Sequence, residues 1–299
     1  MSCYHPLLAV DYGVDPITAK HHVRLLPKRV DCNLDVLRSR YGDSLLLLPC
    51  GHCLGCANDY VHQWAVRILL EASLYKENCF ITLTYKDSCL PSDGRPHRDE
   101  FVRFMKRLRK EIGKEIRVFY CGEVGDTYQR PHYHAIIFGY DFPDKKFAGR
   151  TKKGSDTFIS ETLMKCWKFG FSSIGEVTPG SACYVAQYSM KKKFTGDDHG
   201  EFVGMSRMPG LGCDKFNMRW FSSDTIYCAL GKATIPRFFH KLLEGLKPEF
   251  YEEWKDNRKA RCSQKIGDQY LHGMREEEAY LYNENIKVLT YIRKCRSML

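Results

Sequence analysis

Two short segments carry side chains suited to phosphoryl transfer. His132 and His134 stand two apart in RPHYHAIIF, and side chains two apart in a strand point to the same face. Tyr184 and Tyr188 stand four apart in YVAQYSMKK, so they share one face of a helix. A metal held by the imidazoles would polarise a phosphate. A tyrosine in line with that phosphate would form a covalent phosphotyrosine and release a hydroxyl.

Glu123 is the predicted third metal ligand. It ends the strand that precedes the histidine pair, and a hairpin with its turn near 125–130 would bring it opposite His132. Two imidazoles and one carboxylate leave coordination positions open, which suits a catalytic Mn²⁺ or Mg²⁺. Asp126, in the turn, is the alternative third ligand. An H-x-H pair alone is more often two hydrogen-bonded histidines, but a carboxylate at hairpin distance favours metal binding.

Lys191 distinguishes the two tyrosines. It lies three residues beyond Tyr188 on the same side of the helix, and an ammonium there favours a phenolate, whose pKa is ordinarily about 10. Tyr184 is followed three residues on by the neutral Gln187. We therefore expect Tyr188 to perform the initiating cleavage more readily. Core packing of both rings is the alternative interpretation of the same spacing.

A cluster of cysteines at C-x2-C-x2-C spacing predicts a second metal site. Cys50, Cys53 and Cys56 can wrap one structural Zn²⁺ if a fourth ligand comes from elsewhere. An iron–sulfur cluster uses similar spacing. The candidates for the fourth ligand are Cys3, which we favour, Cys32 and His52.

The elements that must position these residues are mixed. Periodicity predicts helices over 58–76, 99–113, 160–169 and 181–193, the second with Asp99 as its cap. Strands are predicted over 80–85, 116–123, 132–139 and 171–177. The fold class is α+β, with a central antiparallel sheet flanked by helices. The predicted regions are 1–76 with the cysteine cluster, a core over 77–200, and a mainly helical 201–299.

The charge balance favours a polyanionic partner. The 299 residues include 46 Lys and Arg against 36 Asp and Glu, a formal net charge of +10. A solvated charged face is the alternative interpretation of the basic helix at 99–113. No apolar run approaches the roughly 20 residues of a membrane span, and no signal peptide is recognisable at the start, so we expect reduced thiols and a cytoplasmic setting. The candidate DNA contacts are Arg103, Lys106, Arg107, Lys192 and Lys193.

Several segments resemble a known family. RPHYHAIIF resembles the HUH motif of rolling-circle replication initiators, and FITLTY resembles their first motif. YVAQYSMKK is similar to the two-tyrosine motif of the initiators of small icosahedral single-stranded DNA phages. GEVGDTYQRPHYH and MSRMPGLG further resemble the gokushovirus branch of the Microviridae. In the similar phage motif a lysine tends to follow each tyrosine, and Gln187 departs from that pattern.

The resemblance implies an HUH endonuclease fold with the tyrosine helix beside the metal. It implies nicking at the origin of double-stranded replicative-form DNA in the host cytoplasm, with single-stranded origin DNA at the site. It also implies a 5′-phosphotyrosine link, a 3′-hydroxyl that primes a host polymerase, and a host replication helicase as partner. Two alternatives remain: a non-catalytic, zinc-containing nucleic-acid-binding protein, and a plasmid or transposon HUH nuclease. The resemblance gives metal-ligand roles to His132, His134 and Glu123, nucleophile roles to Tyr184 and Tyr188, and the motif-lysine role to Lys191.

Overall fold

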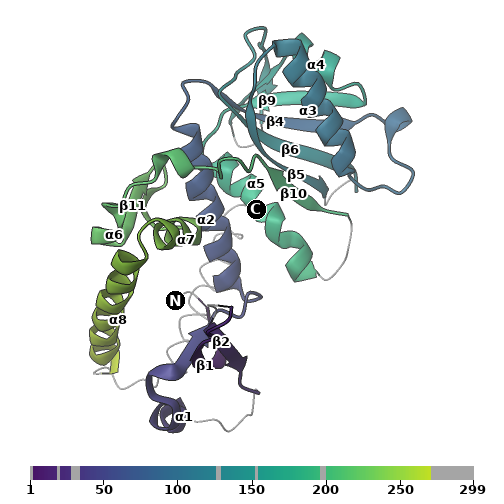
Figure 1. Cartoon of the computed structure of the whole chain (residues 1–299). Helices are drawn as coiled ribbons and strands as arrows, with labels where there is room; N and C mark the ends of the chain where they lie inside the picture. The colour runs from purple at the N-terminus through teal and green to yellow at the C-terminus, as the bar shows by residue number, and fades with distance from the viewer. Residues whose placement is uncertain are drawn as a thin grey trace. The chain divides into compact units, whose positions relative to one another are not determined.

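A computed structural model of the chain is drawn in Figure 1. It describes residues 3–18, 21–27, 34–125, 129–151, 154–195 and 200–270, without the side chains of 189–195, 259 and 262–270. The chain divides into two compact units, one of residues 1–59 with 258–299 and one of residues 60–257. No helix among the described residues is long and apolar enough to cross a membrane.

The larger unit is built on a seven-stranded sheet in the order β10-β5-β6-β4-β9-β8-β7, and all neighbouring strands pair antiparallel. This confirms the predicted α+β class with a large antiparallel sheet. The strands are β4 (Asn78–Tyr85), β5 (Arg117–Val124), β6 (Pro131–Phe138), β7 (Lys146–Arg150), β8 (Asp156–Ile159), β9 (Gly170–Gly175) and β10 (Phe202–Met205).

One face of this sheet is covered by α3 (Arg98–Ile112) and α4 (Glu161–Cys166) (Figure 1). Strand β4 alternates strictly between partly and fully buried side chains, as a strand between two packed layers should. Its fully buried set faces α3, whose apolar stripe at helical spacing was predicted from the sequence. The contacting residues include Ile81, Leu83, Tyr85, Tyr133, Phe101, Phe104, Leu108 and Trp167.

The opposite face is covered by α2 (Leu54–Ala72), from residue 60 on, and by α5 (Pro179–Thr195). Helix α5 contacts β5, β6 and β10. His132 and His134 belong to this face, because they alternate with Tyr133 along β6. The core between these layers includes Ala65, Ile68, Phe119, Ile136, Phe138, Ala182 and Val185.

The far side of α2 in the larger unit carries a second core. Val66 and Leu70 pack there against Phe221, Phe239 and Trp254. The elements that follow the sheet are η3 (Cys213–Lys215), α6 (Trp220–Ser223), β11 (Thr225–Cys228), β12 (Gly231–Thr234), α7 (Arg237–Leu246) and α8 (Pro248–Tyr270). Three strands therefore accompany the helices expected beyond residue 200.

The smaller unit contains a three-stranded antiparallel sheet in the order β2-β1-β3. The sequence predicted no strands here, because β2 is exposed along its whole length and shows no apolar alternation. Its elements are β1 (Leu7–Val14), β2 (His21–Leu25), α1 (Leu34–Tyr41), η1 (Gly42–Ser44) and β3 (Leu45–Leu48).

Some expected boundaries are corrected. Helix α2 begins four residues before the predicted start and ends at Ala72. Helix α3 begins at Arg98 with His97 as its N-cap, so Asp99 lies in the first turn and pairs with Arg103 instead of capping the helix. The compact units do not follow the expected boundaries at 76/77 and 200/201, because α2 packs on the sheet and β10 pairs with β5.

Candidate active site

The β5–β6 hairpin brings the predicted carboxylate to the histidines. Glu123 is the register partner of His132, as the spacing predicted, and Cys121 is the partner of His134. The side chains of Glu123 and His134 are both almost fully buried, at 4% and 5% exposure. A buried carboxylate and a buried imidazole need each other or a ligand to offset the loss of water.

His134 lies at the centre of the cluster. Its Nε2 is 2.8 Å from Oε1 of Glu123, and its Nδ1 is 3.0 Å from Oγ1 of Thr82. Its ring stacks on Phe80 at an interplanar angle of 8°. Thr82 and Phe80 fix the ring plane and leave Nε2 pointing at the carboxylate, which is how protein metal sites commonly orient a histidine ligand. Sequence reasoning missed Thr82, although it placed this residue on the same strand face as Phe80.

His132 presents a free nitrogen to the same side. Its Nδ1 donates to the backbone carbonyl of Arg130 at 2.6 Å, so Nε2 carries the lone pair. Burial lowers its pKa below the ordinary value, which keeps the ring neutral as a metal ligand must be. The donor set of two imidazole nitrogens and a carboxylate therefore fits a divalent cation in its chemistry. Asp126, the alternative ligand, lies outside the described residues.

Helix α5 presents both tyrosines to this cluster. Ala182, Val185 and Ala186 are buried and anchor the helix on the sheet, which turns positions 184 and 188 toward the histidines. The Tyr184 hydroxyl is 3.4 Å from Nε2 of His134. The Tyr188 ring stacks on the His134 ring with centroids 5.8 Å apart. The structure thus brings together the predicted His, Glu and Tyr residues from strands and a helix far apart in sequence.

The two tyrosines differ in their surroundings. Their rings meet edge to face with centroids 5.0 Å apart. Tyr184 is 39% exposed, whereas Tyr188 is half-buried. Burial raises the pKa of Tyr188 well above its usual range, and a hydrogen bond to Tyr184 raises it further because it favours the protonated phenol. Tyr184 is the tyrosine more open to a substrate. The side chains of Lys191, Lys192 and Lys193 lie outside the described part of the chain.

The cysteine cluster belongs to the smaller unit. The sulfurs of Cys3, Cys50, Cys53 and Cys56 all lie within 4.8 Å of one another, and no other group of three or more potential ligands among the described residues is this compact. His52 is exposed and is not one of this group. Cys32, the other alternative, lies outside the described residues.

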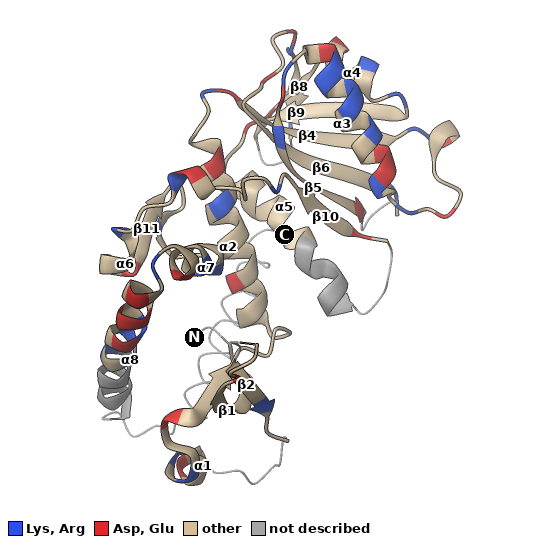
Figure 2. Ribbon diagram, in the orientation of Figure 1, with Lys and Arg blue, Asp and Glu red and all other residues tan. Residues whose placement is uncertain are grey.

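The basic residues of α3 are on the opposite side of the sheet from the histidines. Figure 2 shows Lys and Arg along the outer surface of this helix. Arg103 and Lys106 are exposed. Arg107 is half-buried, and its Nε donates to the carbonyl of Cys166, which ties α3 to α4. Helix α3 packs on the sheet face that carries Tyr133, so these cations do not line the tyrosine and histidine cluster.

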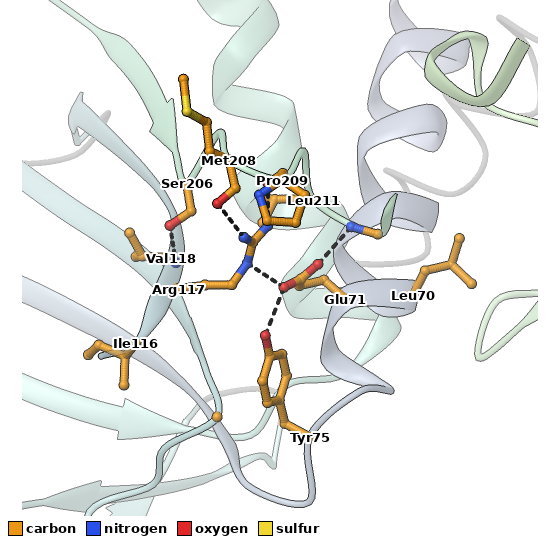
Figure 3. Close-up of polar contacts among 12 residues, drawn as sticks. Leu70, Glu71, Tyr75, Ile116, Arg117, Val118, Ser206, Met208, Pro209 and Leu211 are labelled. Atoms are coloured by element: carbon orange, nitrogen blue, oxygen red, sulfur yellow. Dashed lines mark hydrogen bonds and ion pairs between the residues drawn. The ribbon is translucent and has the colours of Figure 1, made fainter. Parts of the chain in front are cut away.

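A buried ion pair holds α2 to the sheet (Figure 3). Nε of Arg117 is 2.6 Å from Oε1 of Glu71, whose other oxygen accepts from the Gly212 amide at 2.7 Å. Arg117 also donates to the carbonyls of Met208 and Pro209. The segment MSRMPGLG therefore links the sheet edge to α2. Gly212 has φ +76°, a conformation that favours glycine, and a Cβ there would meet the Arg67 carbonyl at 3.2 Å.

Fold and site together define an α+β protein whose antiparallel sheet carries histidines, a glutamate and two tyrosines in one cluster. Residues 78–193, which include all of that cluster, match the family of the phage replication-associated protein ORF2. None of the solved structures compared matches the chain significantly.

Named phage proteins are similar to the chain over most of its length. The replication-associated protein ORF2 of Spiroplasma virus 4 is 29% identical over 98% of the chain and 97% of its own length. The replication-associated protein VP4 of Bdellovibrio phage phiMH2K is 31% identical over 69% of the chain and 70% of its own length. Replication-associated protein ORF4 of Chlamydia phage 1 is 30% identical over 75% of the chain and 62% of its own length. The chain belongs to the replication-associated protein family of the Microviridae.

Proposed function

We propose that this chain initiates phage DNA replication as a metal-dependent endonuclease and strand transferase with an HUH fold. The observation that carries the proposal is the contact of the Tyr184 hydroxyl with His134, 3.4 Å from Nε2, within a cluster that also holds Glu123 and Tyr188. A protein that only binds nucleic acid has no need of a phenol against a buried imidazole and carboxylate.

The protein groups divide the work of the reaction. Nε2 of His132, Nε2 of His134 and the Glu123 carboxylate would hold Mn²⁺ or Mg²⁺, which as a Lewis acid polarises the scissile phosphate. The phenol oxygen attacks phosphorus, the new phosphorus–oxygen bond replaces the bond to the 3′ oxygen, and the phenol gives up its proton. The leaving oxygen gains a proton and becomes a free 3′-hydroxyl. The product is a 5′-phosphotyrosine link.

We propose that Tyr184 makes the first cut. Its hydroxyl is the one against His134 and it is the more exposed tyrosine, while Tyr188 donates its proton toward Tyr184 and is the harder phenol to ionise. A hydrogen bond donated to the attacking oxygen stabilises its anionic form. This order reverses the expectation that Lys191 raised for Tyr188. Tyr188, on the same face, would then serve the second transfer that rejoins the strand.

The partners follow from this reaction. Single-stranded origin DNA occupies the cluster, replicative-form duplex supplies it, and a host helicase and polymerase use the opened strand and its 3′-hydroxyl in the bacterial cytoplasm. Lys192 and Lys193, which follow the tyrosines on α5, would contact the phosphates of the bound strand. Arg103 and Lys106 would contact flanking duplex, because α3 covers the other sheet face. Arg107 contributes less directly, since it is already held by Cys166.

Covalent adduct formation tests the proposal. The full chain is incubated with Mn²⁺ and single-stranded oligonucleotides that tile the genome encoding it, then denatured and analysed by gel and peptide mass spectrometry. We expect an adduct on one oligonucleotide, attached to a peptide that contains Tyr184 or Tyr188. The matched control is Tyr227→Phe, because Tyr227 is an exposed tyrosine of β11. Oligonucleotide binding without any adduct would support the non-catalytic alternative.

A further inference from the structure

The sulfurs of the cysteine quartet have the spacing of a metal tetrahedron. Sγ of Cys50 lies 3.9 Å from Sγ of Cys56, and Sγ of Cys53 lies 3.9 Å from Sγ of Cys3. Zinc–thiolate bonds of about 2.3 Å place sulfurs about 3.8 Å apart in a regular tetrahedron. A disulfide would need about 2 Å. The quartet therefore leaves room for one ion between four thiols.

Backbone amides point at these sulfurs. The amide of Tyr4 donates to Sγ of Cys53 at 3.4 Å, and the amide of Cys50 donates to Sγ of Cys3 at 3.3 Å. The amides of His52 and Cys53 both donate to Sγ of Cys50, at 3.5 and 3.4 Å. Amide donors around sulfur stabilise the thiolate form, as outer-shell hydrogen bonds do in metal sites.

We propose that Cys3, Cys50, Cys53 and Cys56 bind one structural Zn²⁺, with Cys3 as the fourth ligand. The site is closed by four thiolates and keeps no position for substrate, so its role is structural. A multi-iron cluster would spread the four sulfurs around bridging sulfides and does not suit a quartet within 4.8 Å. His52 takes no part, because its side chain is exposed while its amide serves Cys50.

The zinc would replace a hydrophobic core that the smaller unit lacks. Cys3 precedes β1, and its partners lie 47 to 53 residues later, after β3 and at the start of α2, so the ion closes a long loop. Small folds with little apolar burial commonly depend on such a link. The buried side chains among the described residues before position 60 are few and mostly small: Cys3, Tyr4, Ala9, Val10, Cys53, Cys56 and Ala57.

Metal content of the full chain tests the proposal, independently of any nuclease activity. Protein purified without added metal is measured by elemental mass spectrometry. We expect about one zinc per chain, loss of that zinc in Cys3→Ser, and retention in His52→Ala. Cys228→Ser is the matched control, because it removes a half-buried thiol far from the quartet in sequence. Full zinc content in Cys3→Ser would overturn the assignment of the fourth ligand.

A second measurement on the unchanged chain covers the case in which Cys3→Ser does not fold. Alkylation of the native protein is mapped by mass spectrometry with and without a zinc chelator. We expect these four cysteines to become reactive together, and only when the chelator removes the metal. Iron in place of zinc, no bound metal, or alkylation of the four that does not depend on the chelator would each overturn the proposal.

Discussion

The cysteine quartet and the histidine–glutamate cluster are two metal-binding arrangements with opposite designs. In the quartet four identical ligand atoms lie within 4.8 Å, with backbone amides around them. In the other cluster Glu123 is hydrogen-bonded to His134, and the His132 ring centroid is 6.2 Å from that of His134. The first is closed and suits a structural ion, whereas the second offers three ligands and open positions beside a tyrosine.

The two arrangements also differ in how the chain builds them. Three of the four quartet cysteines come from one seven-residue stretch, 50–56, and only Cys3 comes from elsewhere. The other cluster takes side chains from β4, β5, β6 and α5. A closed site can therefore be largely encoded by local spacing, whereas the open site depends on the packing of a helix against a sheet.

The largest effect we expect is the loss of cleavage when the exchangeable metal is removed. Dialysis against EDTA should reduce adduct formation to background, because the scissile phosphate loses its Lewis acid. Adding Mn²⁺ should restore the reaction, while zinc stays bound to the quartet throughout. Parallel adduct assays and elemental analysis separate the two metals. Cleavage that persists after EDTA, or zinc that leaves together with the activity, would break the distinction between an open and a closed site.

Next in size is the difference between the tyrosines. Tyr184→Phe should slow first-strand nicking by roughly 10³-fold or more, because it removes the attacking oxygen. Tyr188→Phe should slow it by about tenfold at most, the contribution of one hydrogen bond, and should instead block rejoining. Single-turnover assays on one labelled oligonucleotide measure both steps. The reverse ranking would return the first cut to Tyr188, as the position of Lys191 suggested.

A smaller effect should follow from Thr82→Val, which removes the hydroxyl at Nδ1 of His134 but keeps the side-chain shape. Loss of such an outer-shell partner typically weakens metal affinity by about 10- to 100-fold. Titration of adduct formation with Mn²⁺ should therefore shift to higher metal concentration and reach a similar plateau. Thr234→Val on the exposed part of β12 is the control. An unchanged titration would mean that Thr82 does not orient the ligand.

The smallest effect concerns the helix on the other face of the sheet. Replacing both Arg103 and Lys106 by Ala should change nicking of a short single-stranded oligonucleotide by no more than about twofold, in the range of surface substitutions. Binding to longer duplex should weaken, with a shallower dependence on salt. Binding isotherms at several salt concentrations give the slope. A large loss on the short substrate would place the strand on α3 as well.

Sequence alone determined the parts of this protein that depend on neighbours along the chain. The strands, the tyrosine helix and the pairing of Glu123 with His132 followed from periodicity and hairpin spacing, which are local. The C-x2-C-x2-C cluster was visible for the same reason. The resemblance to microvirus initiators rested on the same short motifs, and the family matches agree with it.

Tertiary structure alone decided which distant faces meet. The contact of Thr82 with His134 spans 52 residues, and that of Tyr184 with the same ring spans 50. It also put α3 on the sheet face away from the histidines, and it brought Cys3 rather than exposed His52 to the quartet. Such choices depend on which faces bury the most apolar surface together, a property of the whole packed core that no short segment carries.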